Sequence, residues 1–581
     1  MVVYVKEGRG PMVNEGAGQR PSPAAMLRML FGMIAVVALV LGYVGLATYL
    51  RQRPDLGRSV ADLTYYDLQL FVMDSVPLDR GGPYPLTLEI ARFAAPAVTV
   101  YALIDAIYVL FSDRLRRFRI RRLRGHHVVC GTSPAARVLA ERLRATGERV
   151  VTVSPQDDGD LGVGHHHLVG DPSQTRMLQW AGAHRARVLY AFSDDSAANA
   201  RVALTAQRLH RNRREPLIAY MYVADPDLCQ GLRARRLGLA QGPGFRLDFF
   251  NPAQLAARAF LEENPLKQED RRVLIVGLTP FGREVAVELA RQRQMLTDAG
   301  RGVMTLVDPD ASRIVAELEA RYAFLREWDL NVIDCETTEF EAGALESPER
   351  TFLCQHEAEE ALRLALTAVG LWRNTAGQIV VSVDQSATYG QAFAVQPGGP
   401  LLDGLSGQLT VQGIFDTACD PARIGDDLIE QFARAMHEHY VRDRIRQGET
   451  RWVNTSLVPW RELPETLRNA NRSQATDIGR KLAAITATLA PRVDAAPHFS
   501  FTADELERLA RMEHIRWARE REREGWSHGP LRDNDRRLHP DLVEWQNLSE
   551  EAKSKDLNAI RVLPEILADA GFQIVRLPPP D

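Results

Sequence analysis

Hydrophobic positions form two long runs near the start of the chain. Met29–Leu50 holds 22 residues without a charge, which is long enough to cross a hydrocarbon core of about 30 Å as a helix. Phe93–Ser112 holds 20 residues and carries Asp105 inside it. Because an acid at mid-span costs roughly 2.5–3.5 kcal/mol, a buried core helix is the alternative for this run. The pattern predicts a cytoplasmic tail over residues 1–28 and a two-helix transmembrane module over residues 29–112.

An arginine-rich linker follows over residues 113–124. It contains seven arginines, and positive residues collect on the cytoplasmic side of a membrane. We therefore expect two crossings of a plasma (inner) membrane, with both termini and the large C-terminal region in the cytoplasm. Asp105 is the pore candidate if the helices conduct ions, and the alternative is that it reaches toward the arginines. Ala38 and Gly42 form a small-residue pair that would let first helices approach closely.

After the linker, short β-branched strands alternate with amphipathic helices. Residues 125–265 and residues 270–425 each begin with a strand, a glycine and a helix, and further strands and helices follow. Strands that alternate with helices over about 290 residues indicate parallel sheets with helices on both faces. The sequence predicts two doubly wound, Rossmann-like α/β domains.

The first of these domains resembles the RCK/TrkA-N family. The residues that carry the resemblance are a Gly-Asp-Pro turn at 170–172 and the segment AGAHRARVLYAFSDDSAANARVAL at 181–204. Members of this family regulate bacterial potassium channels and transporters, and the order of two helices, a basic linker and two such domains resembles channels with tandem RCK domains. The resemblance implies NAD(H) or an adenine nucleotide at the glycine turn, with an acidic residue after the second strand holding the ribose.

The first glycine turn matches the GxGxxG pattern only in part. It reads GTSPAA from Gly131, with Ser133 in the middle position, and the second strand ends in Ser154 instead of an acid. In the pattern, the middle glycine lets the backbone approach a pyrophosphate. Asp171 is either a helix cap or a ligand contact. These departures make nucleotide binding less expected in the first domain.

The second glycine turn reads GLTPFG from Gly277. It has Thr279 in the middle position but keeps Gly282, and its second strand ends in Asp308. A carboxylate at that place holds a ribose in dinucleotide-binding folds. The second domain is therefore the better candidate for NAD(H) or an adenine nucleotide, and a sheet that has kept its turn without a ligand is the alternative.

The C-terminal part is mainly helical and repeats itself. Leu457–Glu465 (LVPWRELPE) matches Leu542–Glu550 (LVEWQNLSE) at an offset of 85. Upstream, Glu438-His439 matches Glu513-His514 at an offset of 75, so the second copy has about ten extra residues. The predicted repeats cover residues 430–490 and residues 500–578.

The second repeat resembles the RyR domain, a small helical repeat found in ryanodine receptors and in prokaryotic multidomain proteins. Its motif runs from His514 through Gly525-Trp526 and Gly529-Pro530 to His539-Pro540. Aromatic rings beside a guanidinium and an imidazole favour a flat, nucleotide-like ligand, and a packed core locked by an Arg–Asp pair is the alternative. The ligand candidates are Trp517, Trp526, Arg532, Asp533 and His539.

Composition removes several other functions. The net charge of −4 gives no basic field for nucleic acid, and the five cysteines include no CxxC pair. No serine-hydrolase, zinc-protease or P-loop motif occurs, so we expect no enzyme and no catalytic residue. His165-His166-His167 point to alternate faces of a strand, so no metal is expected.

The combined pattern predicts an α/β protein with N-terminal transmembrane helices, two Rossmann-like domains and small, mainly helical RyR-like repeats. We expect a ligand-gated potassium or cation channel, or a regulator of transport. It would act as a homo-oligomer, a dimer or tetramer, in a lipid membrane. The alternative is a membrane-anchored sensor or scaffold that conducts no ions, which is favoured by the lack of a TVGYG filter in the sequence between the two apolar runs.

Overall fold

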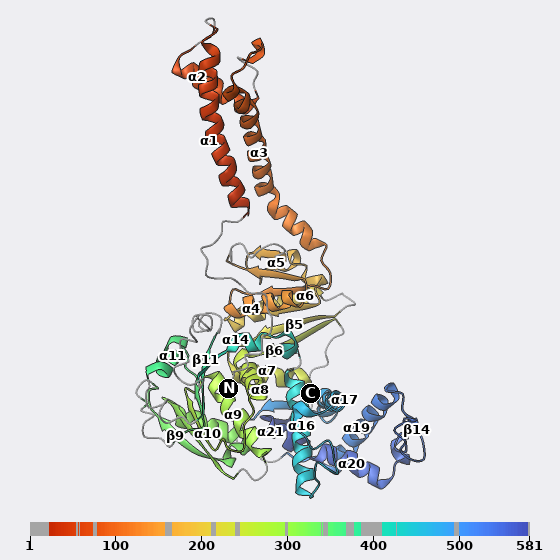
Figure 1. Ribbon diagram of the computed structural model, residues 1–581. Helices are drawn as coiled ribbons and strands as arrows, with labels where there is room; N and C mark the ends of the chain where they lie inside the picture. The colour runs from red at the N-terminus through yellow and green to blue at the C-terminus, as the bar shows by residue number, and fades with distance from the viewer. Residues whose placement is uncertain are drawn as a thin grey trace. The chain divides into compact units, whose positions relative to one another are not determined.

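A computed structural model shows the described residues in two compact units, one up to Arg122 and one from Leu123 onward. In Figure 1 the first unit is red to orange, and the second runs from orange through yellow and green to blue. The structure describes residues 23–53, 56, 58–73, 78–156, 166–210, 216–238, 244–296, 300–337, 340, 347–367, 377–384, 409–425, 427–492 and 499–578.

The first unit is a helical hairpin with a short helix packed on it. Its elements are α1 (Pro23–Leu50), α2 (Val60–Val72), η1 (Leu78–Arg80) and α3 (Leu86–Arg121). By length and composition, Met26–Leu50 and Leu86–Ile107 are apolar enough to cross a membrane. The linker expected at 113–124 is not a separate segment, because α3 continues to Arg121. Arginine and leucine are good helix formers, and no glycine or proline interrupts the helix there.

The small residues of α1 pack inside the same chain. Ala38 belongs to a buried core shared by α1, α2 and α3. Gly42 lies against α2, where a Cβ would overlap the Asp67 carboxylate. The small residues that were expected to let first helices of different chains approach closely therefore contact α2 and α3 of the same chain. The N-terminus of α2 is capped by a capping box of Ser59 and Asp62.

Six parallel strands form the first sheet, in the order β3-β2-β1-β4-β5-β6, which is the order of dinucleotide-binding folds. The strands are β1 (His127–Cys130), β2 (Val150–Ser154), β3 (His166–Val169), β4 (Val188–Ala191), β5 (Leu217–Tyr222) and β6 (Phe245–Phe250). The helices are α4 (Pro134–Ala145), α5 (Thr175–Trp180), η2 (Ala183–Arg185), α6 (Ser196–His210), α7 (Pro226–Gly238) and α8 (Pro252–Glu263).

The second sheet repeats this order as β12-β11-β10-β7-β8-β9, with β7 in the place of β1. Two doubly wound α/β domains are thus confirmed. The strands are β7 (Arg272–Val276), β8 (Gly302–Asp308), β9 (Trp328–Asp334), β10 (Arg350–Leu353), β11 (Gln378–Val383) and β12 (Leu409–Gly413). The helices are α9 (Pro280–Gln294), α10 (Ala311–Arg321), η3 (Ala323–Glu327), α11 (Ala358–Thr367), α14 (Ile414–Ala418) and α15 (Pro421–Gly425).

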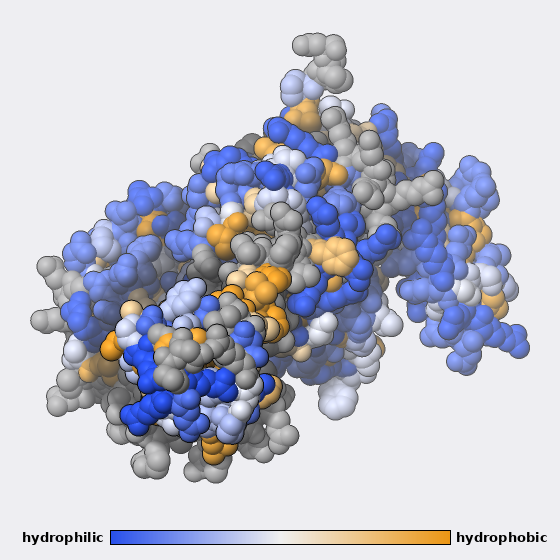
Figure 2. Space-filling view, turned by 90° about the horizontal axis from the view of Figure 1, so that it is seen from above, coloured by the Kyte–Doolittle hydropathy of each residue, from blue (hydrophilic) through white to orange (hydrophobic). Residues whose placement is uncertain are grey.

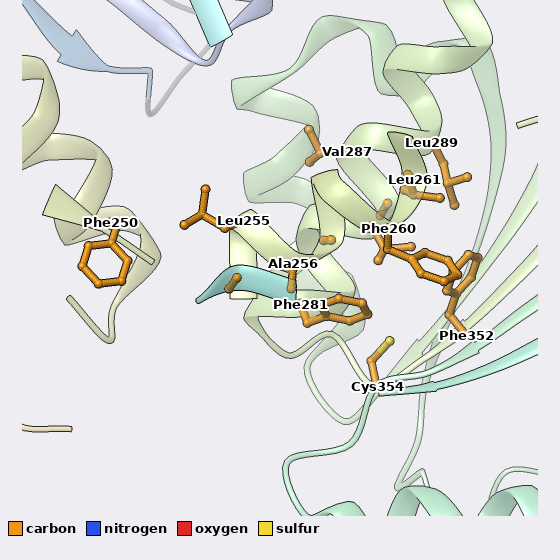
Figure 3. Close-up of a cluster of buried hydrophobic side chains, with 14 of the residues drawn as sticks. Phe250, Leu255, Ala256, Phe260, Leu261, Phe281, Val287, Leu289, Phe352 and Cys354 are labelled. Carbon is orange, nitrogen blue, oxygen red and sulfur yellow. The ribbon is translucent and has the colours of Figure 1, made fainter. Parts of the chain in front are cut away.

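The two α/β domains share one hydrophobic core. Figure 3 shows Phe260 of α8 beside Phe352 of β10, with 6.2 Å between the ring centroids. Helix α8 packs on α9, and α14 returns from β12 to pack on α4 and α8. On the face seen in Figure 2, hydrophobic residues lie in small groups among hydrophilic ones. The shared core therefore holds the strands and glycine turns of both domains together.

The C-terminal part contains two copies of one helical unit. The first copy consists of α16 (Asp427–Arg446), η6 (Trp460–Glu462), α17 (Glu465–Thr476), α18 (Ile478–Ala484) and β13 (Ala487–Pro491). The second consists of α19 (Ala503–Arg523), β14 (Ser527–His528), β15 (Leu538–His539), η7 (Trp545–Asn547), α20 (Glu550–Arg561), α21 (Leu563–Asp569) and β16 (Phe572–Arg576).

The two copies meet through a pair of antiparallel strands. Leu489 of β13 lies opposite Ile574 of β16, which is the residue 85 positions later. The pairs on either side are exchanged by the same offset, since Ala487 faces Arg576 and Pro491 faces Phe572. The copies are therefore related by a local two-fold axis through the central pair.

The structure corrects the histidine pairing between the copies. His437 Nε2 lies 2.7 Å from the Val458 carbonyl oxygen, and His514 Nε2 lies 2.8 Å from that of Val543. His437, not His439, is therefore the equivalent of His514. The offset before the loop is 77 rather than 75, so the second copy has eight extra residues.

Candidate functional site

The turn after β1 uses its own polar groups. Gly131 has φ +143°, and a Cβ there would overlap the Phe192 carbonyl. The buried Ser133 hydroxyl donates to that same carbonyl at 2.6 Å and accepts from Ala136 N at 3.3 Å. A serine side chain thus stands in the position that a middle glycine would leave open for a pyrophosphate.

Two other candidate positions of the first domain serve local structure. Ser154 donates to the Gln156 carbonyl oxygen at 2.6 Å. Asp171 accepts from both the backbone N–H and the hydroxyl of Ser173, each at 2.8 Å, and these bonds lower the pKa of Asp171. Because α5 begins only at Thr175, Asp171 braces the preceding turn and does not cap the helix.

The turn after β7 is closed in a different way. Gly277 has φ +92°, and its Cβ would overlap the Cys354 carbonyl, while a Cβ on Gly282 would overlap the Gly277 carbonyl. Thr279 caps α9 by accepting from Gly282 N at 3.4 Å. The sequence-predicted residues of this turn are therefore brought together at the carboxyl ends of β7 and β8.

Asp308 of this group already has hydrogen-bond donors. Its Oδ2 accepts from Leu278 N at 2.7 Å, and its Oδ1 accepts from Asp310 N at 3.0 Å. Arg283 Nε donates across the same turn to the Leu278 carbonyl oxygen at 2.8 Å. A ribose held by Asp308 would have to share or replace these bonds. The carboxylate therefore braces the turn in the structure.

A cluster of aromatic rings lies on the second C-terminal repeat, at the C-terminal half of α19. The centroids of Trp517 and His539 are 4.9 Å apart in an edge-to-face arrangement, and His539 lies 6.2 Å from Trp526. All three rings are half-buried. His514 packs on the inner side, 5.8 Å from Trp517 and 6.0 Å from Trp545. The ring of Trp517 therefore packs on the buried His514, and the rings of Trp517, Trp526 and His539 remain partly exposed.

The pKa values of the two histidines of this cluster are shifted in opposite directions. Burial alone would lower the pKa of His514, but its hydrogen bonds to Asp556 and to the Val543 carbonyl outweigh burial and raise it. Burial lowers the pKa of His539, opposed by Asp541 and assisted by nearby cationic side chains. Nδ1 of His539 accepts from Asp541 N at 3.1 Å, so the proton of the neutral ring is on Nε2.

Two stretches of the chain match known domain families. Residues 127–230 match the TrkA-N domain, and residues 502–576 match the RyR domain. The chain carries a TrkA-N domain and a RyR domain. Both resemblances found in the sequence are thereby confirmed.

Solved structures with distant similarity include those of the GsuK channel. One, described as "GsuK Channel", is 16% identical, covers 68% of this chain and 96% of its own, and has a TM-score of 0.37. GsuK bound to ADP is 16% identical and covers 68% of this chain and 95% of its own, with a TM-score of 0.36. The GsuK channel bound to NAD is 14% identical and covers 68% and 81%, with a TM-score of 0.35.

The predicted arginine and aspartate of the RyR domain lie outside the ring cluster. Arg532 is exposed and donates to Asn534 Oδ1 at 3.1 Å. Asp533 closes its own loop by accepting from Arg536 N at 3.0 Å. The guanidinium that meets the rings belongs to Arg521, whose Cζ lies 5.5 Å from the Trp526 centroid. Its position four residues after Trp517 on one helix was a signal that could have found it.

Asp105 has a partner that the sequence analysis did not anticipate. Arg28, expected in the tail, is part of α1, and its Nε lies 3.0 Å and 3.3 Å from the two carboxylate oxygens of Asp105. Phe31 and Tyr101 stack beside this pair, with centroids 3.9 Å apart. Asp105 therefore joins α1 to α3 and does not offer an unpaired carboxylate to a pore.

No metal centre is found in the part of the chain that the structure describes, where no three His, Cys, Asp or Glu side chains converge. Of the histidine triplet, His165 lies outside the described residues. His167 is buried, with Nδ1 3.0 Å from the Thr152 hydroxyl.

Proposed function

We propose that this protein is a membrane-anchored regulator of ion transport in which the RyR domain senses a flat, nucleotide-like ligand. The observation that carries the proposal is the group of three half-buried rings, Trp517, Trp526 and His539, on one side of that domain. Tryptophan faces with a guanidinium beside them suit a stacked heteroaromatic ring. We propose no enzymatic step and no metal.

These rings are not needed to build the domain's core. Trp460 of the first repeat is buried in the common core of the two copies, and Trp545 packs against it. Neither Trp517 nor Trp526 belongs to that core among the described residues. An apolar surface kept partly open on a domain that already has a core is typical of a binding site.

Helix α9 offers a route between this domain and the second glycine turn. It starts at that turn, and its Glu288 pairs with Arg434 of the first repeat at 2.6 Å. One turn later, Arg291 donates to the Asp569 carbonyl oxygen of the second repeat at 3.3 Å. A ligand at the rings, or NAD(H) or an adenine nucleotide at the turn, would act on the same helix.

The apolar helices provide the proposed anchor. α1 and α3 would cross the plasma (inner) membrane, with both termini and the unit from Leu123 onward in the cytoplasm, because the arginines follow the second crossing. The protein would act as a homo-oligomer, a dimer or tetramer. Reporter fusions at the N-terminus and after Arg124 should both report the cytoplasm, and a periplasmic signal from either would overturn the two-span arrangement.

Ligand binding is tested on the full chain purified in detergent. Tryptophan fluorescence and thermal shift are followed with NAD(H), ATP, ADP-ribose and cyclic nucleotides. At 100 times its dissociation constant, a ligand of the native state should add about 2.7 kcal/mol of stability. Trp517→Ala should remove the shift, and Trp452→Ala, an exposed tryptophan outside the cluster, should keep it. A shift that survives Trp517→Ala would place the ligand elsewhere.

A channel in its own right is the second candidate, and helix α2 favours it. α2 is 13 residues long and packs against both α1 and α3, as a re-entrant helix does beside a pore. Bilayer recordings of the purified chain with and without ligand would decide between the two. Ligand-dependent cation current would support the channel, and silence under every ligand that binds would support the anchored regulator.

A further inference from the structure

The two C-terminal repeats place corresponding residues around two sites. Corresponding residues of the two repeats are 77 positions apart up to the loops that follow α16 and α19. Both loops begin with a glycine of φ +84°. After the loop the offset is 85. The corresponding pairs, with the first repeat named first, are Tyr440 and Trp517, Arg444 and Arg521, Gly448 and Gly525, Glu449 and Trp526, and Asn454 and His539.

Asn454 and His539 are held in the same manner. Oδ1 of Asn454 accepts from Ser456 N at 3.1 Å, and Nδ1 of His539 accepts from Asp541 N at 3.1 Å. Each side chain is left with one nitrogen that donates, Nδ2 in asparagine and Nε2 in the neutral histidine. The two donors therefore occupy equivalent positions in the two repeats.

In the first repeat a side chain of the protein fills the site. Asn454 Nδ2 donates to Glu449 at 2.7 Å and to the Tyr440 hydroxyl at 2.9 Å. Arg444 lies over the Tyr440 ring at 5.3 Å and donates to the other Glu449 oxygen at 3.2 Å. One carboxylate is thus bound by an arginine and an amide beside an aromatic ring.

The second repeat keeps an arginine and a side-chain donor at the equivalent positions but has no carboxylate at the position of Glu449. Trp526 replaces the glutamate, and Arg521 lies over its ring. Among the described residues no acceptor is seen for His539 Nε2. Arg532 and Lys555 add positive charge near His539, and Glu524 takes one donor of Arg521 at 2.8 Å. A donor and a guanidinium therefore lie beside half-buried rings, as an amide and a guanidinium lie beside Glu449 in the first repeat.

We infer that Glu449 is an internal substitute for the anionic group of the ligand of the RyR domain, and that Arg521 and His539 are the residues that bind this group. The inference rests on the proposed function and narrows its ligand to a flat ring system that carries a carboxylate or phosphate. The first repeat is closed to such a ligand by Glu449, so of these two equivalent positions only the one in the second repeat is open.

The roles of Arg521 and His539 are tested by measuring the binding of three probes to the full chain in detergent. The three probes share one ring system. They are adenosine, AMP and adenosine-5′-carboxylic acid, and only the signal lost in Trp517→Ala is counted. A charge-assisted hydrogen bond contributes about 1.5–3 kcal/mol, so the anionic probes should bind roughly 10- to 100-fold more tightly than adenosine. Preference for AMP alone would identify phosphate as the source, and equal gains would show that any anionic oxygen suffices.

The variants then assign the preference to residues. Arg521→Gln and His539→Phe should each bring the anionic probes to within about 3-fold of adenosine while adenosine still binds. His539→Asn, which copies the first repeat, should keep most of the preference, and Arg444→Gln should leave it unchanged. An unchanged preference in both of the first two variants, or none in the wild type, would overturn the inference while binding at Trp517 still supports the proposed function.

A test without ligand decides the inference even if no probe binds. Trp526→Glu places a carboxylate where Glu449 stands in the first repeat, and Trp526→Gln is the uncharged match. The Tm of the full chain should be higher for Trp526→Glu by about 1–4 °C, and high salt should shrink the difference. Glu449→Gln should lower the Tm by a similar amount. Equal Tm values for the two Trp526 variants would overturn the inference.

Discussion

The two Rossmann-like domains have the same strand order and the same tight glycine turn, yet they close that turn with different side chains. In the TrkA-N domain the Ser133 hydroxyl donates to the Phe192 carbonyl oxygen. In the second domain the Asp308 carboxylate accepts the N–H of Leu278. A hydroxyl at the start of the helix stabilises the turn in the first domain, and a carboxylate at the end of the neighbouring strand stabilises it in the second.

This difference separates two reasons for keeping a glycine. In both domains a Cβ on the glycine would overlap the carbonyl that follows a neighbouring strand of the sheet, β4 in the first domain and β10 in the second. The sheet therefore requires the glycine whether or not a nucleotide binds. The residues that would meet a nucleotide differ between the two domains, as Ser154 and Asp308 show. A glycine turn is therefore evidence for the fold, and its neighbours are the evidence for the ligand.

The largest expected effect comes from the glycines themselves. Gly131→Ala and Gly277→Ala should each cost about 2–5 kcal/mol, because positive-φ strain adds to the overlap with a carbonyl. Denaturant unfolding of the full chain measures this. Gly147→Ala, with φ +82° and open space around it, is the control and should cost about 1 kcal/mol. A loss confined to Gly277→Ala would mean that the first turn is not built as described.

Acid should affect the first domain before the second. His126 is fully buried immediately before β1, and burial, assisted by Arg185, lowers its pKa to about 4 against the hydrogen bond to the Ala181 carbonyl. A depressed histidine pKa gives stability that is full above about 6.5 and lost as the pH falls toward 4. At pH 5 the loss should be about 2 kcal/mol.

Hydrogen exchange at two pH values checks the acid effect. Strand β1 should lose protection between neutral pH and pH 5, whereas β7, where Arg272 stands in the corresponding position, should keep it. His126→Phe should reduce the difference and leave the smaller part that comes from His127, whose pKa burial also lowers. Equal loss of protection in both strands would contradict the role of His126.

Removing the Asp308 carboxylate should cost more stability than removing the hydroxyl of Ser154, which ends the corresponding strand of the first domain. Asp308→Ala leaves the buried Leu278 N–H without its acceptor and should cost about 1–2 kcal/mol. Ser154→Ala removes one hydroxyl bond and should cost about 0.5–1.5 kcal/mol. Thermal unfolding of the two variants side by side measures this. If Asp308→Ala instead leaves stability unchanged but abolishes NAD(H) binding, Asp308 is a ribose ligand and not a brace.

The smallest effect is expected at the middle position of each turn. Thr279→Gly loses a helix cap and should cost only a few tenths of a kcal/mol. Ser133→Gly loses the cap and the bond to Phe192, and should cost about 1 kcal/mol. Denaturation midpoints resolve this difference. If Thr279→Gly proved the more costly of the two, the assignment of Ser133 as the closing side chain would be wrong.

Local periodicity made the sheets and the repeats predictable. Alternating strands and helices determine a doubly wound sheet almost alone, and the offset of 85 carries directly into the pairing of Leu489 with Ile574. The histidine register was predicted wrongly because His437-Glu438-His439 contains two candidates, and only the carbonyl of Val458 distinguishes them.

Partners brought together by the fold could not be read from the sequence. Asp308 looks like a ribose ligand until the buried N–H of Leu278 is seen beside it. Asp105 looks like an unpaired acid until Arg28 proves to lie on the facing helix, 77 positions earlier. In each case the deciding atom is distant in sequence, and no spacing rule connects the two.

The strand pair β13–β16 makes the two C-terminal repeats one folding unit. Residues 502–576, the part that matches the RyR domain, end in a strand whose hydrogen-bonding partner belongs to the other copy. Cutting the chain before Phe499 would be equivalent to dissociating a dimer, since it bares the edge of β16 and the apolar faces around Phe432 and Phe572. Excised pieces should therefore aggregate unless they begin near Asp427, and mutations at this seam should impair both repeats at once.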